Sequence, residues 1–189
     1  MEIITKAELR IRIDEILERI SKGEIFIYPT DTIYGIGCNA ENQESVKKIR
    51  ELKEGRPTAP FSLWVPSLDW IEKNCTVTKQ AVEWLEQLPG PLTIIMNLKN
   101  QNSISKNIAP EVNTIGIRYP DHWFGKVVEM LGIPIVTTSA NKTGEPFMTS
   151  IENLDLKVKK GVSFIIYEGP KEGRPSKIVH VGKGKVRER

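Results

Sequence analysis

The sequence alternates short apolar runs with amphipathic segments of helical period, and this alternation constrains its fold more than any other feature. An apolar run at 25–28 precedes a helical pattern at 44–53, and apolar runs at 92–98 and 114–118 precede a helical pattern at 123–131. Strand and helix patterns that alternate in this way are typical of α/β domains, in which helices cover a sheet. We therefore expect an α/β fold, and 189 residues are about the length of one domain.

Local signals mark the ends of several predicted elements. Thr5 and Glu8 form a capping box, and a stripe of apolar residues follows at helical spacing as far as Gly23, so we expect one helix there. The segment 30–40 is polar and contains glycines, which predicts a loop. We expect further strands over 61–65, 133–136, 163–167 and 177–181, a return strand over 185–189, and helices over 67–71, 80–88 and 153–160.

Composition excludes several classes of protein. Cys38 and Cys75 are too few for a disulfide scaffold or a zinc site, and they suit a reducing compartment. The two histidines, His122 and His180, exclude a multi-histidine metal centre. No apolar run is long enough to span a membrane, and the charged N-terminus lacks the core of a signal peptide. We expect a cytoplasmic protein with no membrane partner and no metal held by its side chains.

Basic residues are concentrated in two stretches. The formal net charge is +3, but residues 170–189 alone carry seven basic and two acidic side chains, a local net charge of +5. A second basic cluster lies at 47–56. Such clusters attract the phosphates of a nucleotide or of RNA. A solvated helix face and a frayed tail would have the same composition, so this pattern leaves both interpretations open.

Polar side chains follow two of the expected strands, at the points where ligand crevices open in α/β sheets. They lie at Thr30–Thr32 and at Thr137–Pro146, although capped turns would have the same residues. Arg118 closes an apolar strand, where a charge is costly unless it meets a partner. Its guanidinium suits a carboxylate ligand, and a surface salt bridge is the alternative. The sequence contains neither of the standard glycine-rich nucleotide loops, so a nucleotide would bind in another way.

Several of these segments together resemble a known family. YPTDTIYGIG, a Lys/Arg site followed by Pro60-Phe-Ser-Leu, PGPLT, IGIRYPDH, TTSANKTGEP and SKIV occur in the order seen in the YrdC-like family. The resemblance covers about residues 20–189. It implies a twisted mixed β-sheet with flanking helices that encloses a concave, positively lined cavity. It also implies one catalytic domain over 1–189, without the extra C-terminal domain of some members.

The activity that the resemblance implies is that of a threonylcarbamoyl-AMP synthase. Such enzymes are nucleotidyltransferases that join L-threonine, bicarbonate and ATP into threonylcarbamoyl-adenylate and release pyrophosphate. A partner transferase then moves the threonylcarbamoyl group to the tRNA adenosine next to the anticodon. ATP is therefore expected as a substrate, with Mg²⁺ held mainly by its phosphates.

The resemblance also assigns roles to individual residues. The residues expected to bind threonine are Thr32, Arg118, Ser139 and Ser176. Those expected to bind ATP are Lys53, Arg56, Thr114, Asn141, Thr149 and Arg187. The catalytic group is expected to comprise Lys53, Arg56, Ser139 and Asn141.

This sequence departs from the family pattern at several positions. The arginine of the family's Lys-x-Arg element falls on Gly55, and Arg56 stands one place later. Ala59 replaces a usual asparagine, Trp64 a common histidine and His180 a usual aspartate. The departures leave two alternatives open: a non-catalytic RNA-binding paralogue of the same fold, and an enzyme that handles a carbamoyl-adenylate.

Overall fold

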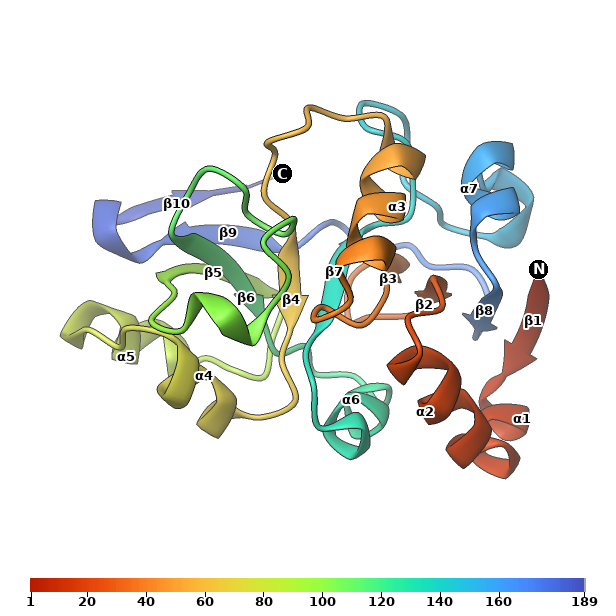
Figure 1. The fold of residues 1–189 in the computed structure, drawn as a ribbon, viewed down its shortest axis with the longest axis horizontal. Helices are drawn as coiled ribbons and strands as arrows, with labels where there is room; N and C mark the ends of the chain where they lie inside the picture. The colour runs from red at the N-terminus through yellow and green to blue at the C-terminus, as the bar shows by residue number, and fades with distance from the viewer. Residues whose placement is uncertain (189) are drawn as a thin grey trace.

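Ten strands form one mixed sheet in the computed structural model, which describes residues 1–188 (Figure 1). Their order across the sheet is β1-β8-β2-β3-β7-β4-β6-β5-β9-β10. The pairs β1–β8, β2–β8, β4–β6 and β5–β9 are parallel and the others are antiparallel. The strands are β1 (Glu2–Thr5), β2 (Phe26–Tyr28), β3 (Gly35–Gly37), β4 (Ser62–Trp64), β5 (Leu92–Asn97), β6 (Thr114–Arg118), β7 (Ile135–Ser139), β8 (Phe164–Tyr167), β9 (Lys177–His180) and β10 (Lys185–Arg187).

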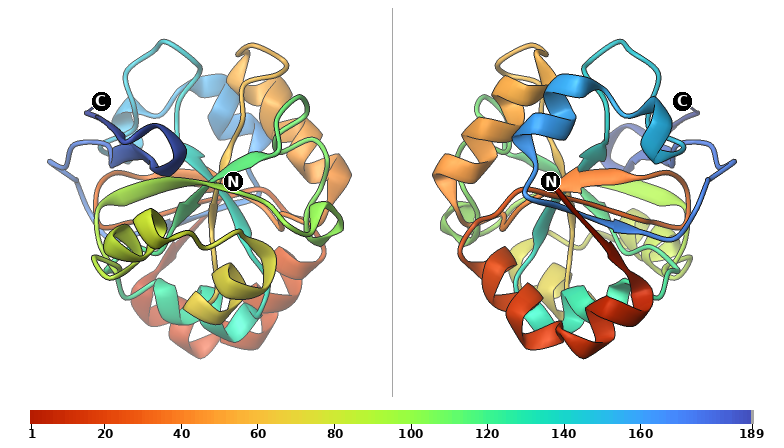
Figure 2. Two further views of the ribbon diagram at one scale, coloured as in Figure 1. Left: turned by 90° about the vertical axis from the view of Figure 1, so that its left-hand side faces the viewer. Right: turned by 90° about the vertical axis from the view of Figure 1, so that its right-hand side faces the viewer.

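Helices cover both faces of this sheet, as the α/β pattern predicts. Figure 2 shows α1, α2 and α6 on one side and α3 and α7 on the other. The helices are α1 (Lys6–Ile11), α2 (Ile13–Ser21), α3 (Gln43–Lys53), α4 (Leu68–Asn74), α5 (Lys79–Leu85), α6 (Gly125–Leu131) and α7 (Leu156–Gly161), with short 3-10 turns at Gln101–Ser103, Ile151–Asn153 and Val181–Lys183. Within residues 1–188, no helix has the length and apolar character needed to cross a membrane.

Side chains that alternate along the strands divide the core into two clusters. Tyr28 and Trp64 face α1, α2 and α6, whereas Ile27 and Leu63 lie in the cluster that includes buried residues of α3 and α7. Because successive side chains of a strand point to opposite faces, a strand covered on both sides is apolar throughout. The apolar runs at 25–28 and 61–65 are therefore strands buried on both faces.

The predicted first helix is present but interrupted. Its capping box is confirmed, since the Thr5 hydroxyl accepts from the Glu8 amide and the Glu8 carboxylate accepts from the Thr5 amide. The prediction of one continuous helix is wrong at Arg12, whose φ of −107° and ψ of 25° separate α1 from α2. At this break the Arg12 guanidinium pairs with Glu2 of β1 and with Glu15 of α2.

Two further predictions need correction because they depend on the order of strands in the sheet. The segment 30–40 is not all loop, since Gly35–Gly37 forms β3 between β2 and β7. Gly37 suits this place because a Cβ there would lie 2.2 Å from the Val136 carbonyl oxygen. The strand expected at 133–136 instead runs over Ile135–Ser139, where Thr138 and Ser139 pair with β3. The sequence analysis also missed β1, which pairs with β8.

Candidate active site

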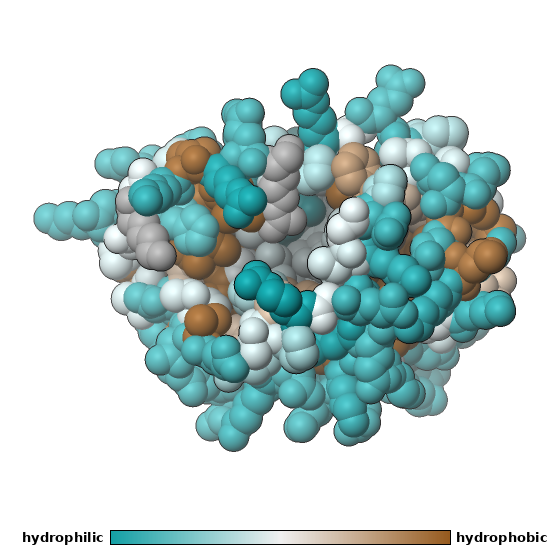
Figure 3. Space-filling view, turned by 90° about the horizontal axis from the view of Figure 1, so that it is seen from above, coloured by the Kyte–Doolittle hydropathy of each residue, from teal (hydrophilic) through white to brown (hydrophobic). Residues whose placement is uncertain are grey.

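The four residues expected to bind threonine line one small cavity. Thr32 comes from the turn after β2, Arg118 from the end of β6, Ser139 from the end of β7, and Ser176 from the residue before β9. The cavity has a volume of about 30 Å³, which is room for about one water molecule. Seen from above, the molecule is hollowed near its middle, and hydrophilic side chains surround much of this hollow (Figure 3). The fold thus gathers residues that lie up to 144 positions apart in the sequence.

Arg118 is the buried cation of this cavity, with 7% of its surface exposed. Its Nη2 donates to Asp31 Oδ1 at 2.7 Å and to Thr32 Oγ1 at 3.3 Å. Burial lowers the pKa of Arg118, and the negative charge of Asp31 opposes that shift. The salt bridge that the sequence analysis kept as an alternative therefore exists, but it is buried and adjoins the cavity.

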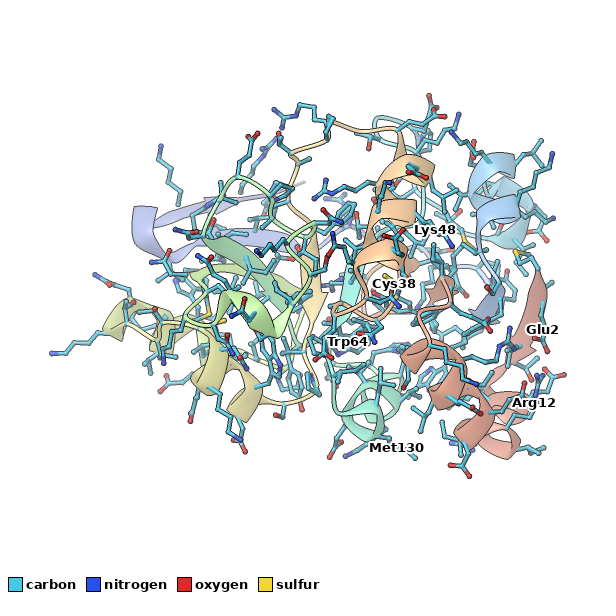
Figure 4. All side chains as sticks on the ribbon, in the orientation of Figure 1. Glu2, Arg12, Cys38, Lys48, Trp64 and Met130 are labelled. Atoms are coloured by element: carbon cyan, nitrogen blue, oxygen red, sulfur yellow. The ribbon has the colours of Figure 1, made fainter. Side chains whose placement is uncertain are left out.

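Three buried polar atoms near this ion pair have no hydrogen-bond partner within residues 1–188. They are Arg118 Nε, Asp31 Oδ2 and Trp64 Nε1. Trp64 pairs with Arg118 across β4 and β6, and its ring lies beside Phe124, next to α6 (Figure 4). Buried polar groups in folded proteins nearly always have a partner, so unpaired ones mark a place where water or a ligand group belongs.

The turn after β2 is organised by Thr30, which is fully buried. Its hydroxyl donates to the Ile33 carbonyl at 2.7 Å and accepts from the Thr32 amide at 3.1 Å. The hydroxyls of Thr30 and Thr32 lie 3.0 Å apart. The interpretation of this segment as a capped turn is therefore correct for Thr30, while Thr32 and Asp31 reach Arg118.

Lys53 fixes the loop that carries Ser139 and Asn141. From the end of α3, its Nζ donates to the Ser139 carbonyl at 2.7 Å and to the Asn141 carbonyl at 2.8 Å. The Asn141 side-chain oxygen lies 3.3 Å from the same nitrogen and accepts from the Ser139 hydroxyl at 2.5 Å. Three of the four residues expected to be catalytic thus form one buried network.

The fourth, Arg56, lies apart from this network on an exposed loop. Glu54 ends α3 in the left-handed conformation, with φ of 49°, and its carboxylate pairs with Lys142 at 3.2 Å. Gly55 packs against the loop after β7, and a Cβ at Gly55 would lie 2.5 Å from Thr143 Oγ1. A larger residue at position 55 would therefore require the exposed Thr143 side chain to shift.

A larger cavity of about 450 Å³ adjoins the small one, and Ser62 lines both. Thr114 lines this larger cavity, as do Met96, Asn97 and Ile178. Within the described chain, no lysine or arginine is among its lining residues. Among the described residues that line the two cavities, Arg118 is therefore the one lysine or arginine, and His180 lines the larger cavity.

Five of the six residues expected to bind ATP line neither cavity, and Thr114 is the exception. Arg187 is exposed on β10, where it pairs with Ile178 of the larger cavity wall. Thr149 is half-buried, and its hydroxyl accepts from the Asn153 amide group at 2.7 Å. Lys53 and Asn141 lie in the buried loop network instead. The structure therefore gathers the residues expected for threonine more closely than those expected for ATP.

A covering segment, residues 168–176, crosses the turn after β2 and contributes Pro175 and Ser176 to the wall of the small cavity. Lys171 Nζ donates to the Thr30 carbonyl at 2.8 Å, and the Tyr34 hydroxyl donates to the Gly169 carbonyl at 2.7 Å. Gly173 lies so close to the turn that a Cβ there would be 1.8 Å from the Thr32 carbonyl oxygen. The covering segment thereby brings Ser176 into the cavity wall.

Two residues that contact the predicted site directly were not among those expected to bind a substrate or to be catalytic. Thr93 holds Ser176, with their hydroxyl oxygens 2.7 Å apart in the buried interior. Asp31 holds Arg118. Thr93 lies in the PGPLT motif and Asp31 in YPTDTIYGIG, so the motifs contained both, but only the fold shows which residues they meet.

Comparison with known proteins gives three informative similarities. A Methanocaldococcus jannaschii protein provisionally named a threonylcarbamoyl-AMP synthase is 36% identical over 95% of this chain and 85% of its own length. The Bacillus subtilis threonylcarbamoyl-AMP synthase is 32% identical over 80% of this chain and 44% of its own length. A P. abyssi Sua5 structure complexed with L-threonine is 25% identical and superposes with a TM-score of 0.85, over 98% of this chain and 55% of that one.

The chain thus spans most of the first relative and about half of the other two. The family model for Sua5, YciO and YrdC proteins, described as "Telomere recombination", matches residues 18–188. That range includes both cavities and every residue of the buried networks around them. Sequence and fold therefore agree that this chain belongs to the Sua5/YciO/YrdC family.

Proposed function

We propose that this protein is an L-threonylcarbamoyladenylate synthase. It converts L-threonine, bicarbonate and ATP into threonylcarbamoyl-AMP, pyrophosphate and water, and is thereby a nucleotidyltransferase. The observation that carries the proposal is the small cavity, where three hydroxyls and one buried guanidinium from four separate segments converge. The relatives named threonylcarbamoyl-AMP synthase and the threonine-bound Sua5 support it.

The small cavity is the proposed threonine site. Arg118 binds the α-carboxylate, because a guanidinium offers a planar set of donors that matches a carboxylate. The hydroxyls of Thr32, Ser139 and Ser176 orient the amine and the side-chain hydroxyl. In this proposal the covering segment 168–176 moves outward when threonine enters the cavity, whose volume is about 30 Å³.

The larger cavity is the proposed nucleoside site, with Thr114 in its wall. Its volume of about 450 Å³ lies in the range of small-molecule sites, which is about 300–1,000 Å³. We assign the phosphates to the side nearest Ser62, Lys53 and Asn141, with Arg56, Thr149 and Arg187 closing on them. Mg²⁺ enters with ATP and is held mainly by the phosphates.

The chemistry then requires mainly that reactants are held in place. The threonine amine attacks carbon dioxide or bicarbonate to form a carbamate, and a carbamate oxygen attacks the α-phosphorus of ATP while pyrophosphate leaves. Holding two reactants at the junction of adjoining cavities replaces an encounter in solution by a step within one complex. Lys53, Arg56, Ser139 and Asn141 are the proposed catalytic group, because charge and hydrogen-bond donors near the phosphates stabilise the developing negative charge.

Two other functions remain as outcomes of the test. An enzyme that handles a bare carbamoyl-adenylate would have no carboxylate for Arg118 to bind. A non-catalytic RNA-binding paralogue would use the exposed basic side chains of 47–56 and of 170–188. In the proposed function, the product instead passes to a partner transferase that modifies tRNA, and any direct RNA contact is secondary.

The test is synthesis of the adenylate from defined substrates. The protein is incubated with ATP, bicarbonate, Mg²⁺ and labelled L-threonine, and both pyrophosphate and labelled adenylate are quantified. Equal amounts of both are expected, both should disappear when bicarbonate is removed, and both should fall together at low threonine concentration when Arg118→Ala is used. Asp121→Asn is a matched control, because Asp121 is exposed and lies three residues after Arg118. Adenylate formed without threonine would favour the carbamoyl-adenylate reaction, and tRNA binding without pyrophosphate release would favour the RNA-binding paralogue.

A further inference from the structure

The charge that a ligand meets in the small cavity depends on one side chain. Among the lining residues in the described chain, Arg118 alone is charged, and the others are hydroxyl-bearing, aliphatic, aromatic, glycine or proline. A ligand in this cavity is therefore sensitive to whatever offsets the charge of Arg118. That group is Asp31, which lies behind the guanidinium and is not part of the cavity wall.

The Asp31–Arg118 pair leaves part of the guanidinium available. The side chains of Arg118 and Asp31 are 8% and 9% exposed, and a single nitrogen, Nη2, contacts a single oxygen, Oδ1, at 2.7 Å. Within residues 1–188, Arg118 Nη1 makes no hydrogen bond and Nε is buried without one. A ligand carboxylate can therefore bind Arg118 while Asp31 stays in place, so the bound state contains both anions.

The charged side chains near the Asp31–Arg118 pair do not change the net charge of that pair. Lys171 and Glu168 form their own pair at 2.5 Å, and His122 contacts Glu168 at 3.1 Å. Burial lowers the pKa of His122, which favours the neutral ring. Lys53 binds the Ser139 and Asn141 carbonyls and contributes the same charge whatever residue stands at position 31. A comparison of variants at position 31 therefore isolates the charge of Asp31.

We propose that Asp31 makes the small cavity selective for a zwitterionic amino acid over a simple carboxylate of the same shape. With Asp31 present, the Arg118 pair is neutral, so a zwitterion leaves the site neutral and a carboxylate anion leaves one buried negative charge uncompensated. Without the charge of Asp31 the preference reverses, because the anion then neutralises Arg118. Uncompensated buried charge is strongly unfavourable, so the effect on selectivity is large. The inference rests on the proposed function only in taking threonine as the ligand.

The experiment compares two ligands that differ by one ammonium group. Binding of L-threonine and of (3R)-3-hydroxybutanoate is measured by titration calorimetry for the wild type, Asp31→Asn and the control Asp121→Asn. We expect the wild type and the control to prefer threonine. In Asp31→Asn, the ratio of the two dissociation constants should shift toward hydroxybutanoate by at least about tenfold, the effect of one charge at short range in a partly screened site.

The outcomes separate this inference from the proposed function. If Asp31→Asn still binds threonine with an unchanged ratio, the inference is wrong and the proposed function stands. If the wild type binds no threonine, both are wrong. Asp31→Glu keeps the charge and should keep the wild-type ratio. Equal binding of the two ligands by the wild type also overturns the inference, whether or not Asp31→Asn folds.

Discussion

The two adjoining cavities of this protein differ in how completely the fold prepares them. All four residues expected to bind threonine line the small cavity and are already held by other side chains. The larger cavity has room for a nucleoside, yet only Thr114 of the six residues expected to bind ATP lines it. The proposed amino-acid site is therefore built before its ligand arrives, whereas the proposed nucleotide site has to be completed around its ligand.

This difference between the cavities affects how much each side chain contributes to the free energy of ligand binding. Side chains already fixed by hydrogen bonds lose little freedom when a ligand binds, so their contacts contribute mainly to affinity and selectivity. Exposed side chains such as Arg56 and Arg187 have to be ordered at that moment, which offsets part of their contribution. Substitutions should therefore have larger effects around the small cavity than around the larger one.

Replacement of Arg118 should have the largest effect. Arg118→Ala removes charged hydrogen bonds worth about 1.5–3 kcal/mol, so threonine should bind about 10- to 100-fold more weakly while ATP affinity changes little. It also leaves Asp31 buried without its cation, which should lower the free energy of unfolding by about 3–5 kcal/mol. Calorimetry with each substrate and urea unfolding measure both effects. Equal loss of affinity for both substrates would contradict the assignment of Arg118 to threonine.

Replacement of Lys53 should weaken the binding of both substrates, and so should not distinguish the two cavities. Lys53→Met leaves the Ser139 and Asn141 carbonyls without their donor, at a cost of about 1–3 kcal/mol in unfolding free energy. Because this loop carries one residue assigned to each substrate, affinity for both threonine and ATP should fall, and adenylate synthesis with them. Lys48→Met, on the exposed side of the same helix, is the matched control and should change neither. Loss of ATP affinity alone would mean that Lys53 acts on phosphate and not through the loop.

Thr114 offers a change confined to the larger cavity. Thr114→Val keeps the shape of the side chain and removes one hydroxyl, which is worth about 0.5–1.5 kcal/mol if it binds the nucleotide. ATP should then bind a few-fold more weakly, with threonine affinity and unfolding unchanged. Nucleotide titration with and without threonine measures this, and unchanged ATP affinity would place the nucleoside elsewhere.

The smallest effect is expected on β10, where Arg187 and Lys185 are both exposed. Arg187→Ala should weaken ATP about twofold to fivefold, as expected for an exposed charged contact of at most about 1 kcal/mol, and Lys185→Ala should not. If this region binds RNA instead, both substitutions should weaken tRNA binding by similar amounts. Binding should then fall with salt with a slope near −0.7 per single-strand phosphate neutralised. The side chain of Lys183 and the whole of Arg189, which belong to the same basic stretch, lie outside the described residues.

Local sequence patterns predicted most of the elements, because helix caps and apolar periods act over a few residues. The Thr5–Glu8 capping box and the Thr114–Arg118 strand are confirmed. The motifs also named four of the residues that line the small cavity. The Asp31–Arg118 contact could not be predicted, because it joins residues 87 positions apart and depends on strand order. β3 could not be predicted for the same reason. Its glycines are typical of a loop, and only the strand order shows that β7 lies so close to them that a Cβ would clash.

The contact between Gly173 and the Thr32 carbonyl leaves no gap under the covering segment wide enough for a methyl group. On the proposed chemistry, this has a consequence for the lifetime of an unstable species. A carbamate on a free amine loses carbon dioxide readily in water, and enclosure protects reactive intermediates from such side reactions. A segment that returns after threonine has entered would shelter the carbamate until the phosphate reaches it. Gly173→Ala, which props this cover open, should then lower pyrophosphate release and adenylate yield together without changing the affinity for ATP.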